Sequence, residues 1–419
     1  MSDLDQELEK TENGLTKRVT SINKLHTKLY DAKPSIVVRS PGRAEIIGNH
    51  VDYNSGIVIA GAIQQSTLVT ITPTTTETIN IYSDQFSTNI SSFNLEVITK
   101  DKYVLIDSPK WCNYVLSVLQ TMNSNGIKFL GLNITITSTV PFSGGVSSSA
   151  ALELGIAKAV SELFSQPTSN KQLADLCQIA EHNIGSNCGL LDQYAVALGE
   201  AESFLKLDFQ DNSVETINVD LDGRSFLIVF DPNVKRELGE TGYPERRKSC
   251  ETGLQLLSEV SGLELTSLRD ATMSQLRKYS ESFIAKATET SHDGNRLLKR
   301  VTHIVSEISR TEQSITKLLE NDLEGFGKLM TESGQSALDN YDLDDDTPEL
   351  RYLFETLKQN PKVMGVRNMG GGFSAVVLAL VDNSEIQSIE KYISELYMSE
   401  YNSELETIVF TPSAGTSLM

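Results

Sequence analysis

A loop rich in glycine and serine carries the strongest chemical signal in the chain. It reads Pro-Phe-Ser-Gly-Gly-Val-Ser-Ser-Ser-Ala-Ala over residues 141–151, after an alternating apolar segment and before an apolar helical one. Gly144 and Gly145 allow the backbone to approach a ligand and to adopt positive φ. A Walker loop needs the pattern Gly-x4-Gly-Lys-Ser/Thr, and no lysine stands here. The loop therefore predicts a phosphate site built from backbone N–H groups, serine hydroxyls and the positive end of a helix. A plain flexible turn is the alternative.

Three further clusters of polar residues or glycines could complete such a site. Residues 40–56 hold Arg, Glu, Asn, His and Asp between apolar segments, which favours a polar small-molecule site. Residues 180–194 carry Glu181 at the end of a helix and Asp192 just after a glycine turn. Taken singly, these two acids would be read as a helix surface residue and an N-cap. Residues 364–374 place three glycines before a strand, which suits either a tight turn or a close approach to a nucleotide.

The hydrophobic pattern indicates the elements that must position these clusters. We expect strands at 35–39 and 57–63, around a turn-rich segment, and at 68–72, 79–82, 132–137, 226–230, 375–380 and 406–410. We expect helices at 4–30, 111–122, 150–164, 171–182, 192–198, 243–258, 296–319, 321–337 and 384–398. Because strands and helices are mixed without strict alternation, the pattern predicts an α+β fold in two domains, 1–220 and 221–419.

Composition limits the partners of the protein. The net charge of −20 over 419 residues repels nucleic acid and anionic membranes. The acidic start has no apolar signal-peptide core, and the apolar run 57–63 is too short to span a bilayer. The four cysteines lack metal-site spacing and are expected to be reduced thiols. The acidic run 339–346 is interpreted as a solvated loop rather than a calcium site. We expect a cytoplasmic monomer that binds neither nucleic acid nor membrane.

The four clusters, in this order, resemble the galactokinase branch of the GHMP (galacto-, homoserine, mevalonate and phosphomevalonate) kinase superfamily. The resemblance runs from about residue 40 to the C-terminus. Features peculiar to the branch are Gly-Arg-x-x-x-Ile-Gly-x-His-x-Asp-Tyr at 42–53, Gly-x-x-Asp-Gln at 189–193 and Gly-Tyr-Pro-Glu-Arg-Arg at 242–247. The resemblance implies a two-lobed fold, with an N-terminal lobe like domain 2 of ribosomal protein S5 and a ferredoxin-like C-terminal lobe. The active site would lie between the lobes.

The resemblance also implies a reaction, the transfer of the ATP γ-phosphate to the C1 hydroxyl of a sugar. It assigns Asp192 as the catalytic base and Arg43 as the residue that holds Asp192 ionised. Ser148 and Glu181 match ligands of Mg²⁺, so ATP and Mg²⁺ are expected. The implied sugar-binding residues are Glu45, Asn49, His50, Asp52, Gly189 and Tyr243. The implied ATP-binding residues are Trp111, Gly144, Gly145, Val146, Ser147, Ser148, Ser149 and Ala150; for Trp111, core packing is an equal alternative.

The sequence departs from the family pattern at two places. Asn49 stands where galactokinases usually have Glu, and an uncharged side chain would better tolerate a C6 carboxylate or a sugar lacking C6. Ser374 and Ala375 replace the common Gly-Gly of the third motif. Galactose is the leading expected substrate, with galacturonic acid, L-arabinose and N-acetylgalactosamine as alternatives. A non-catalytic sensor of sugar and ATP is disfavoured because Ser149, Ala150 and both acids are kept. Mevalonate and homoserine are disfavoured by the 42–53 and 242–247 segments.

Overall fold

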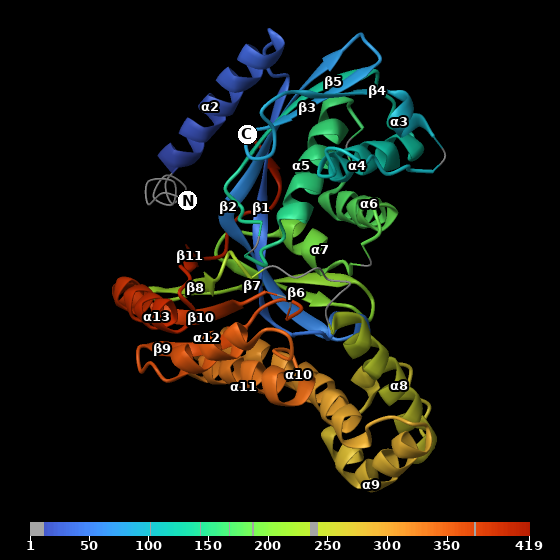
Figure 1. Ribbon diagram of the computed structural model, residues 1–419, viewed down its shortest axis with the longest axis vertical. Helices are drawn as coiled ribbons and strands as arrows, with labels where there is room; N and C mark the ends of the chain where they lie inside the picture. The colour runs from blue at the N-terminus through green and yellow to red at the C-terminus, as the bar shows by residue number, and fades with distance from the viewer. Residues whose placement is uncertain are drawn as a thin grey trace.

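The part of the chain that the structure describes folds around two β-sheets, one of eight strands and one of four (Figure 1). The computed structural model describes residues 12–100, 102–142, 144–166, 168–186, 188–234, 242–372 and 374–419. The predicted α+β class is confirmed. The helix expected at 4–30 is α2 (Glu12–Tyr30), and its expected first residues lie outside the described part. Positions 143, 187 and 373 of the predicted motifs also lie outside it.

The larger sheet is built on two long antiparallel strands, β1 (Ile36–Ile47) and β2 (Ile57–Thr74). Their register shifts near Pro41 and again near Glu45, so β1 is irregular where it carries the polar residues of the predicted site. The strand order is β12-β1-β2-β5-β3-β4, with β6 paired to β2 and β7 to β6. The other strands are β3 (Thr78–Ser83), β4 (Ser91–Asn94), β5 (Gly131–Ser138), β6 (Ser203–Asp208), β7 (Ser213–Asn218) and β12 (Ser417–Leu418).

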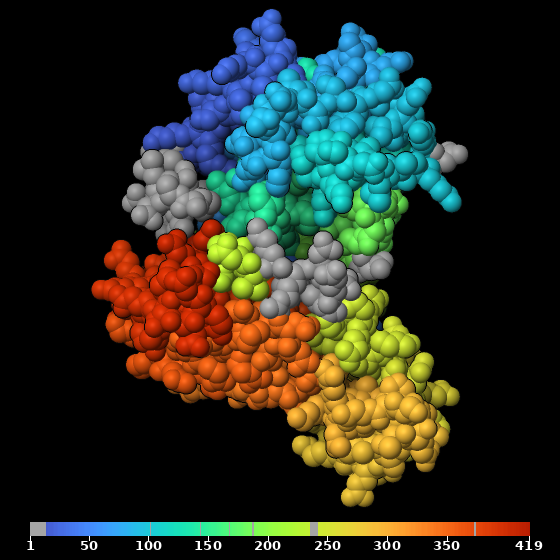
Figure 2. Space-filling view, viewed as in Figure 1, coloured from blue at the N-terminus to red at the C-terminus, as the bar shows by residue number. Residues whose placement is uncertain are grey.

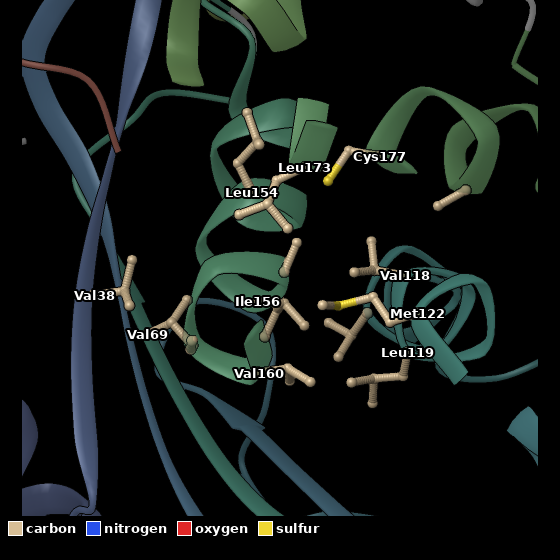
Figure 3. Packing of buried hydrophobic residues seen from close by; sticks show 14 of the residues in the cluster. Val38, Val69, Val118, Leu119, Met122, Leu154, Ile156, Val160, Leu173 and Cys177 are labelled. Carbon is tan, nitrogen blue, oxygen red and sulfur yellow. The ribbon is translucent and has the colours of Figure 1, made fainter. Parts of the chain in front are cut away.

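Helices cover one face of this sheet, and α2 lies on the other side (Figure 1). The helices are α3 (Glu96–Thr99), α4 (Cys112–Ser124), α5 (Ser148–Leu163), α6 (Asn170–Asn183) and α7 (Leu191–Leu198). Helix α5 is apolar on several sides because it packs between the sheet and the outer helices. Figure 3 shows Leu154, Ile156 and Val160 of α5 between Val38 and Val69 of the sheet and Val118, Leu119 and Met122 of α4. This burial anchors the start of α5, which follows the glycine- and serine-rich loop.

The smaller sheet is antiparallel, with the order β11-β8-β10-β9. Its strands are β8 (Arg224–Phe230), β9 (Val363–Asn368), β10 (Val376–Asp382) and β11 (Glu406–Phe410). The associated helices are α8 (Tyr243–Ser261), α9 (Met273–Glu289), α10 (Gly294–Leu319), α11 (Leu323–Tyr341), α12 (Pro348–Lys358) and α13 (Ile386–Tyr401). Figure 2 shows α9, in gold, protruding at the lower end of the molecule.

The sequence pattern was wrong about the segment that follows residue 39. That segment was expected to be rich in turns, but β1 continues to Ile47, so Arg43 and Glu45 stand in a strand. The strands expected at 57–63 and 68–72 are one continuous strand, β2. Both errors have one cause: polar residues of β1 and β2 are buried inside the protein, so apolar alternation no longer marks the strands. Strands β4, β6, β7, β9 and β12 and helices α3, α9 and α12 were not expected.

The acidic run at 339–346 is partly solvated, with Asp339, Asp345 and Asp346 exposed, and it also forms ion pairs that were not expected. Asp342 pairs with Arg296 at 2.7 Å and with Arg300 at 3.0 Å. Asp344 pairs with Arg351 at 2.5 Å. Carboxylates on the turn after α11 are thus neutralised by arginines of α10 and α12, which the local composition of the run does not reveal.

The division at residue 220 stays a prediction. The second sheet begins with β8, while β12 at the far end of the chain returns to pair with β1 through Val38 and Leu418. Within the described residues, none of the helices is both long enough and apolar enough to cross a membrane.

Candidate active site

The predicted site residues meet at a cavity of about 310 Å³. Predicted residues that line it are Arg43, Glu45, Asn49, His50, Asp52, Gly145, Val146, Ser147, Ser148, Ser149, Glu181, Gly189, Asp192 and Tyr243. Gly144, Ala150 and Trp111 are not part of this lining. The third motif contributes Gly370, Gly371 and Ser374, and the described lining also includes Phe142, Ser186, Cys188 and Leu191. Four clusters that are far apart in the sequence therefore share one cavity.

Asp192, in the first turn of α7, is held by Arg43 of β1. Arg43 Nε donates to Asp192 Oδ1 at 2.8 Å, and Nη2 lies 2.5 Å from the same oxygen. Arg43 Nη1 donates to the Gly145 carbonyl oxygen at 2.5 Å, so the guanidinium also touches the glycine- and serine-rich loop. Ser147 Oγ donates to Asp192 Oδ2. A carboxylate fixed beside a cation and next to an anion-binding loop is suited to take a proton from a reacting hydroxyl.

The loop joins the start of α5 without a side-chain cap. Ser147 is the N-cap residue and has φ of 58°, but its hydroxyl goes to Asp192 rather than to the helix backbone. The first N–H groups of α5 are thus left uncapped by this side chain, as an anion site requires. Gly42 brings the loop close to β1, because a Cβ there would lie 2.7 Å from the Val146 carbonyl oxygen. The Arg43 backbone N–H donates to that same oxygen at 3.0 Å.

Glu181, near the end of α6, is a buried carboxylate that faces the loop. It accepts hydrogen bonds from Gln193 Nε2 at 2.6 Å, Cys188 Sγ at 3.2 Å and Ser149 Oγ at 3.4 Å. Burial raises the pKa of Glu181. Within the described residues, no group of three or more His, Cys, Asp or Glu side chains could hold a metal. The predicted ligands Ser148 and Glu181 fit Mg²⁺ nonetheless, because that ion is usually held by one or two carboxylates together with substrate phosphates and water.

Glu45, Asn49 and His50 form another part of the cavity lining. Arg367 Nη2 donates to Glu45 Oε1 at 2.9 Å, and Asn49 Nδ2 lies 3.4 Å from the same oxygen. His50 has φ of 61°, which is strained for a residue with a side chain. Its Nδ1 bonds to the Tyr53 hydroxyl at 2.8 Å, and its Nε2 is buried with no partner among the described residues. Burial, followed by nearby Arg246, holds the pKa of His50 well below its usual range.

Asp52 and Gly189 meet at the third side of the cavity. A Cβ at Gly189 would lie 2.8 Å from Asp52 Oδ2, so the glycine leaves room for the Asp52 carboxylate in its present position. Burial is the largest cause that raises the pKa of Asp52, to about 6, and the Glu45 carboxylate adds to it. Asp52 is therefore mostly ionised at pH 7 and can accept hydrogen bonds from a polar ligand.

Glu307 of α10 holds the backbone of residues 48 and 49, just after β1, although the sequence did not point to it. Its Oε1 accepts from the backbone N–H groups of Gly48 and Asn49, each at 3.2 Å, and from Ser333 Oγ at 2.6 Å. Its Oε2 is paired with Arg310. Glu307 is fully buried, but a glutamate in a helical segment is normally taken for a surface residue. No local feature of the sequence therefore indicated its position.

An aromatic cluster lies beside the loop. The rings of Phe86 and Trp111 are stacked with centroids 5.4 Å apart, and Phe86 meets Phe142 edge-on at 4.4 Å. Phe86 is 43% exposed and Phe142 is 51% exposed. Apolar rings left open to solvent next to a phosphate-binding loop offer a surface on which a planar base can stack.

Comparisons with known proteins agree with this geometry. The chain matches the family models "GHMP kinases N terminal domain" at residues 113–200, "GHMP kinases C terminal" at 314–397 and "Galactokinase galactose-binding signature" at 24–73. A galactokinase of Staphylococcus saprophyticus is 32% identical over 392 residues, which cover 90% of this chain and 95% of the relative.

Solved structures show the same fold. A Lactococcus lactis galactokinase complexed with galactose superposes with a TM-score of 0.84 at 26% identity, covering 96% of this chain and 99% of that one. A Methanococcus jannaschii mevalonate kinase shares the fold, with a TM-score of 0.62 at 18% identity over 92% of this chain and 98% of the other. The fold and site thus define a kinase of the GHMP superfamily, which uses ATP to phosphorylate a hydroxyl group. Within that superfamily, the chain belongs to the galactokinase family. The resemblance drawn from the sequence motifs is confirmed.

Proposed function

We propose that this protein transfers the γ-phosphate of ATP to the C1 hydroxyl of galactose. The observation that carries the proposal is Asp192, which is held by Arg43 and Ser147 inside the cavity that the glycine- and serine-rich loop also lines. The galactokinase relatives and the galactose bound in the Lactococcus lactis protein support galactose as the acceptor.

Each part of the site has a role in this reaction. Asp192 accepts the proton of the C1 hydroxyl, and Arg43 keeps the carboxylate in place and offsets charge that develops on the transferred group. The loop from Gly144 to Ala150 binds the phosphates of ATP. Ser148 and Glu181 would hold Mg²⁺, which supplies charge neutralisation on the phosphates when bound. The residues that bind the sugar are Glu45, Asn49, His50, Asp52, Gly189 and Tyr243.

The direct test is ADP release by the purified protein with ATP, Mg²⁺ and a panel of sugars. Galactose should be the best acceptor in a panel that includes galacturonate, L-arabinose and N-acetylgalactosamine. Mass spectrometry of the product should place the new phosphate on C1. Failure to turn over any of these sugars would refute the proposal.

The KM for galactose should rise as the pH falls from 7 to 5. Asp52 has a pKa raised to about 6, so it takes up a proton across this interval and loses its value as a charged acceptor. One unit below that pKa about 90% of the group is protonated, which predicts an increase in KM of about tenfold. Initial rates at varied galactose test this, and the KM for ATP serves as the internal control. A galactose KM that stays constant over the interval would contradict the role of Asp52.

Trp111→Ala should raise the KM for ATP and leave the KM for galactose unchanged. We propose that adenine stacks on the cluster formed by Phe86, Trp111 and Phe142. Stacking of a base on an aromatic ring contributes about 1–3 kcal/mol, which corresponds to an increase of about fivefold or more. Tyr392→Ala, at an exposed ring on α13, is the matched control. An unchanged ATP KM in the Trp111 variant would favour a core-packing role.

We further propose that the protein acts as a cytoplasmic monomer with two lobes divided at residue 220. Size-exclusion chromatography with light scattering tests the monomer, and limited proteolysis tests the division.

A further inference from the structure

Glu45 places a negative charge next to Asn49 at one corner of the cavity. Arg367 Nη2 and Asn49 Nδ2 both donate to its Oε1, at 2.9 and 3.4 Å. Asn49 Nδ2 also donates to the Gly370 carbonyl oxygen at 3.2 Å. Glu45, Asn49 and Arg367 are all buried, so this arrangement is tied together across β1, β9 and the glycine turn.

The second oxygen of Glu45 is left for a ligand. No described residue donates a hydrogen bond to Oε2, yet this atom is not enclosed by protein, and Glu45 lines the cavity. Both N–H groups of the Asn49 amide are engaged, by Glu45 and by Gly370, while Asn49 Oδ1 has no partner among the described residues. At this corner the two side chains therefore offer hydrogen-bond acceptors, which suit the hydroxyl of a sugar and repel a carboxylate.

The net charge of the groups that line the cavity also disfavours binding of a sugar that carries a carboxylate. Its described lining contains the carboxyl groups of Glu45, Asp52, Glu181 and Asp192, and Arg43 is the only Lys or Arg among the described lining residues. Arg43 is already paired with Asp192. Arg367 is not part of the lining and lies behind Glu45, so it is not available to neutralise an acidic sugar.

We propose that Glu45, positioned by Arg367 and Asn49, binds a hydroxyl of a neutral sugar and excludes uronic acids, so that the uncharged Asn49 does not open the site to them. The proposal rests on the proposed sugar kinase function and names the class of sugar that the site accepts. It assigns the selectivity for neutral sugars to Glu45, with Arg367 as a positioning residue.

The test compares galactose with galacturonate as acceptors, in kinetics and in equilibrium binding by calorimetry. For the wild-type protein, kcat/KM for galacturonate should be lower by at least about 100-fold, because an added carboxylate would lie close to Glu45. Glu45→Gln should shrink this difference by at least about tenfold, mainly through a higher KM for galactose and with less effect on kcat. Glu395→Gln, which makes the same chemical change in an exposed ion pair on α13, should leave the ratio unchanged.

A second variant guards against a folding defect. Glu45→Gln leaves the buried Arg367 without its counter-ion, so Glu45→Gln/Arg367→Gln removes both charges together. Thermal unfolding identifies which variant is folded, and that variant should show the reduced discrimination. A wild-type kcat/KM for galacturonate within threefold of that for galactose would overturn this inference but not the proposed function. The same holds if the folded variant keeps the wild-type ratio of the two kcat/KM values. Absence of both binding and turnover for every sugar would instead overturn the proposed function.

Discussion

Asp192→Asn is expected to lower kcat by about 10²–10⁴-fold and to leave the protein folded, because an amide cannot accept the proton of the attacking hydroxyl. The substitution preserves the shape of the side chain and one oxygen that can accept from Arg43. Binding of ATP and of galactose should therefore change much less than turnover. Coupled measurement of ADP release gives kcat, and calorimetry gives the two affinities.

The matched control for this prediction is Asp346→Asn, the same change at an exposed aspartate outside the cavity. That variant should keep the kcat of the wild-type protein. If Asp192→Asn also kept it, Asp192 would not be the base. If Asp192→Asn instead showed no cooperative thermal transition, its loss of activity would be explained by a failure to fold. Asp192→Ala with the same binding measurements would then separate the two effects.

Glu307→Gln is expected to destabilise the protein by about 3–5 kcal/mol, because it removes one partner of a buried ion pair and leaves Arg310 unpaired. Glu307 also accepts hydrogen bonds from the backbone N–H groups of Gly48 and Asn49, so the segment that contains these two residues should become more mobile in the variant. The KM for galactose should then rise more than the KM for ATP. Urea unfolding monitored by circular dichroism measures the loss of stability.

The pH dependence of this loss has a defined sign. Nearby Arg310 and His303 outweigh burial and hold the pKa of Glu307 at about 2, below its ordinary value of 4.5. A depressed pKa in the folded state stabilises the protein above the unfolded value and loses that contribution as the pH falls from about 4.5 to 2. The difference in stability between wild type and Glu307→Gln should therefore shrink over this interval. Glu312→Gln, an exposed change on the same helix, is the control, and equal stability of Glu307→Gln and wild type would refute the role.

Much of the candidate site could be predicted because its chemistry is local in the chain. The Gly-Gly tract lies in one loop, and the Ser-Ser-Ser tract leads from that loop into α5, which begins at Ser148. The motif at 42–53 carries four residues that line the cavity within eight positions, Glu45, Asn49, His50 and Asp52. Residue types and spacing of this kind are visible in a single sequence, and their joint order was enough to point to the superfamily.

The elements around the site were harder to predict where burial does not follow a simple period. Arg43 and Glu45 stand in β1, which the pattern ended at residue 39 because buried polar residues interrupt the apolar signal. Helix α9 was not expected, and its buried residues Leu276, Phe283 and Ala287 are few and widely spaced. Hydrophobic periodicity reports only the local contrast between buried and exposed positions.

The amino-acid sequence was enough to predict which residues could take part in the reaction: a lysine-free loop for phosphate, an aspartate three residues after a glycine, and a polar segment expected to bind the sugar. How these residues contact one another follows from the folded protein. Arg43 and Asp192 are 149 positions apart, and Glu45 and Arg367 are 322 apart, yet each pair is in direct contact. Such pairings arise from the packing of whole elements, here β1 against α7, and from side chains that reach from one sheet to the other, here from β9 to β1. Packing also placed Glu307 against the backbone of residues 48 and 49 and brought the Glu45 carboxylate into contact with the Asn49 amide.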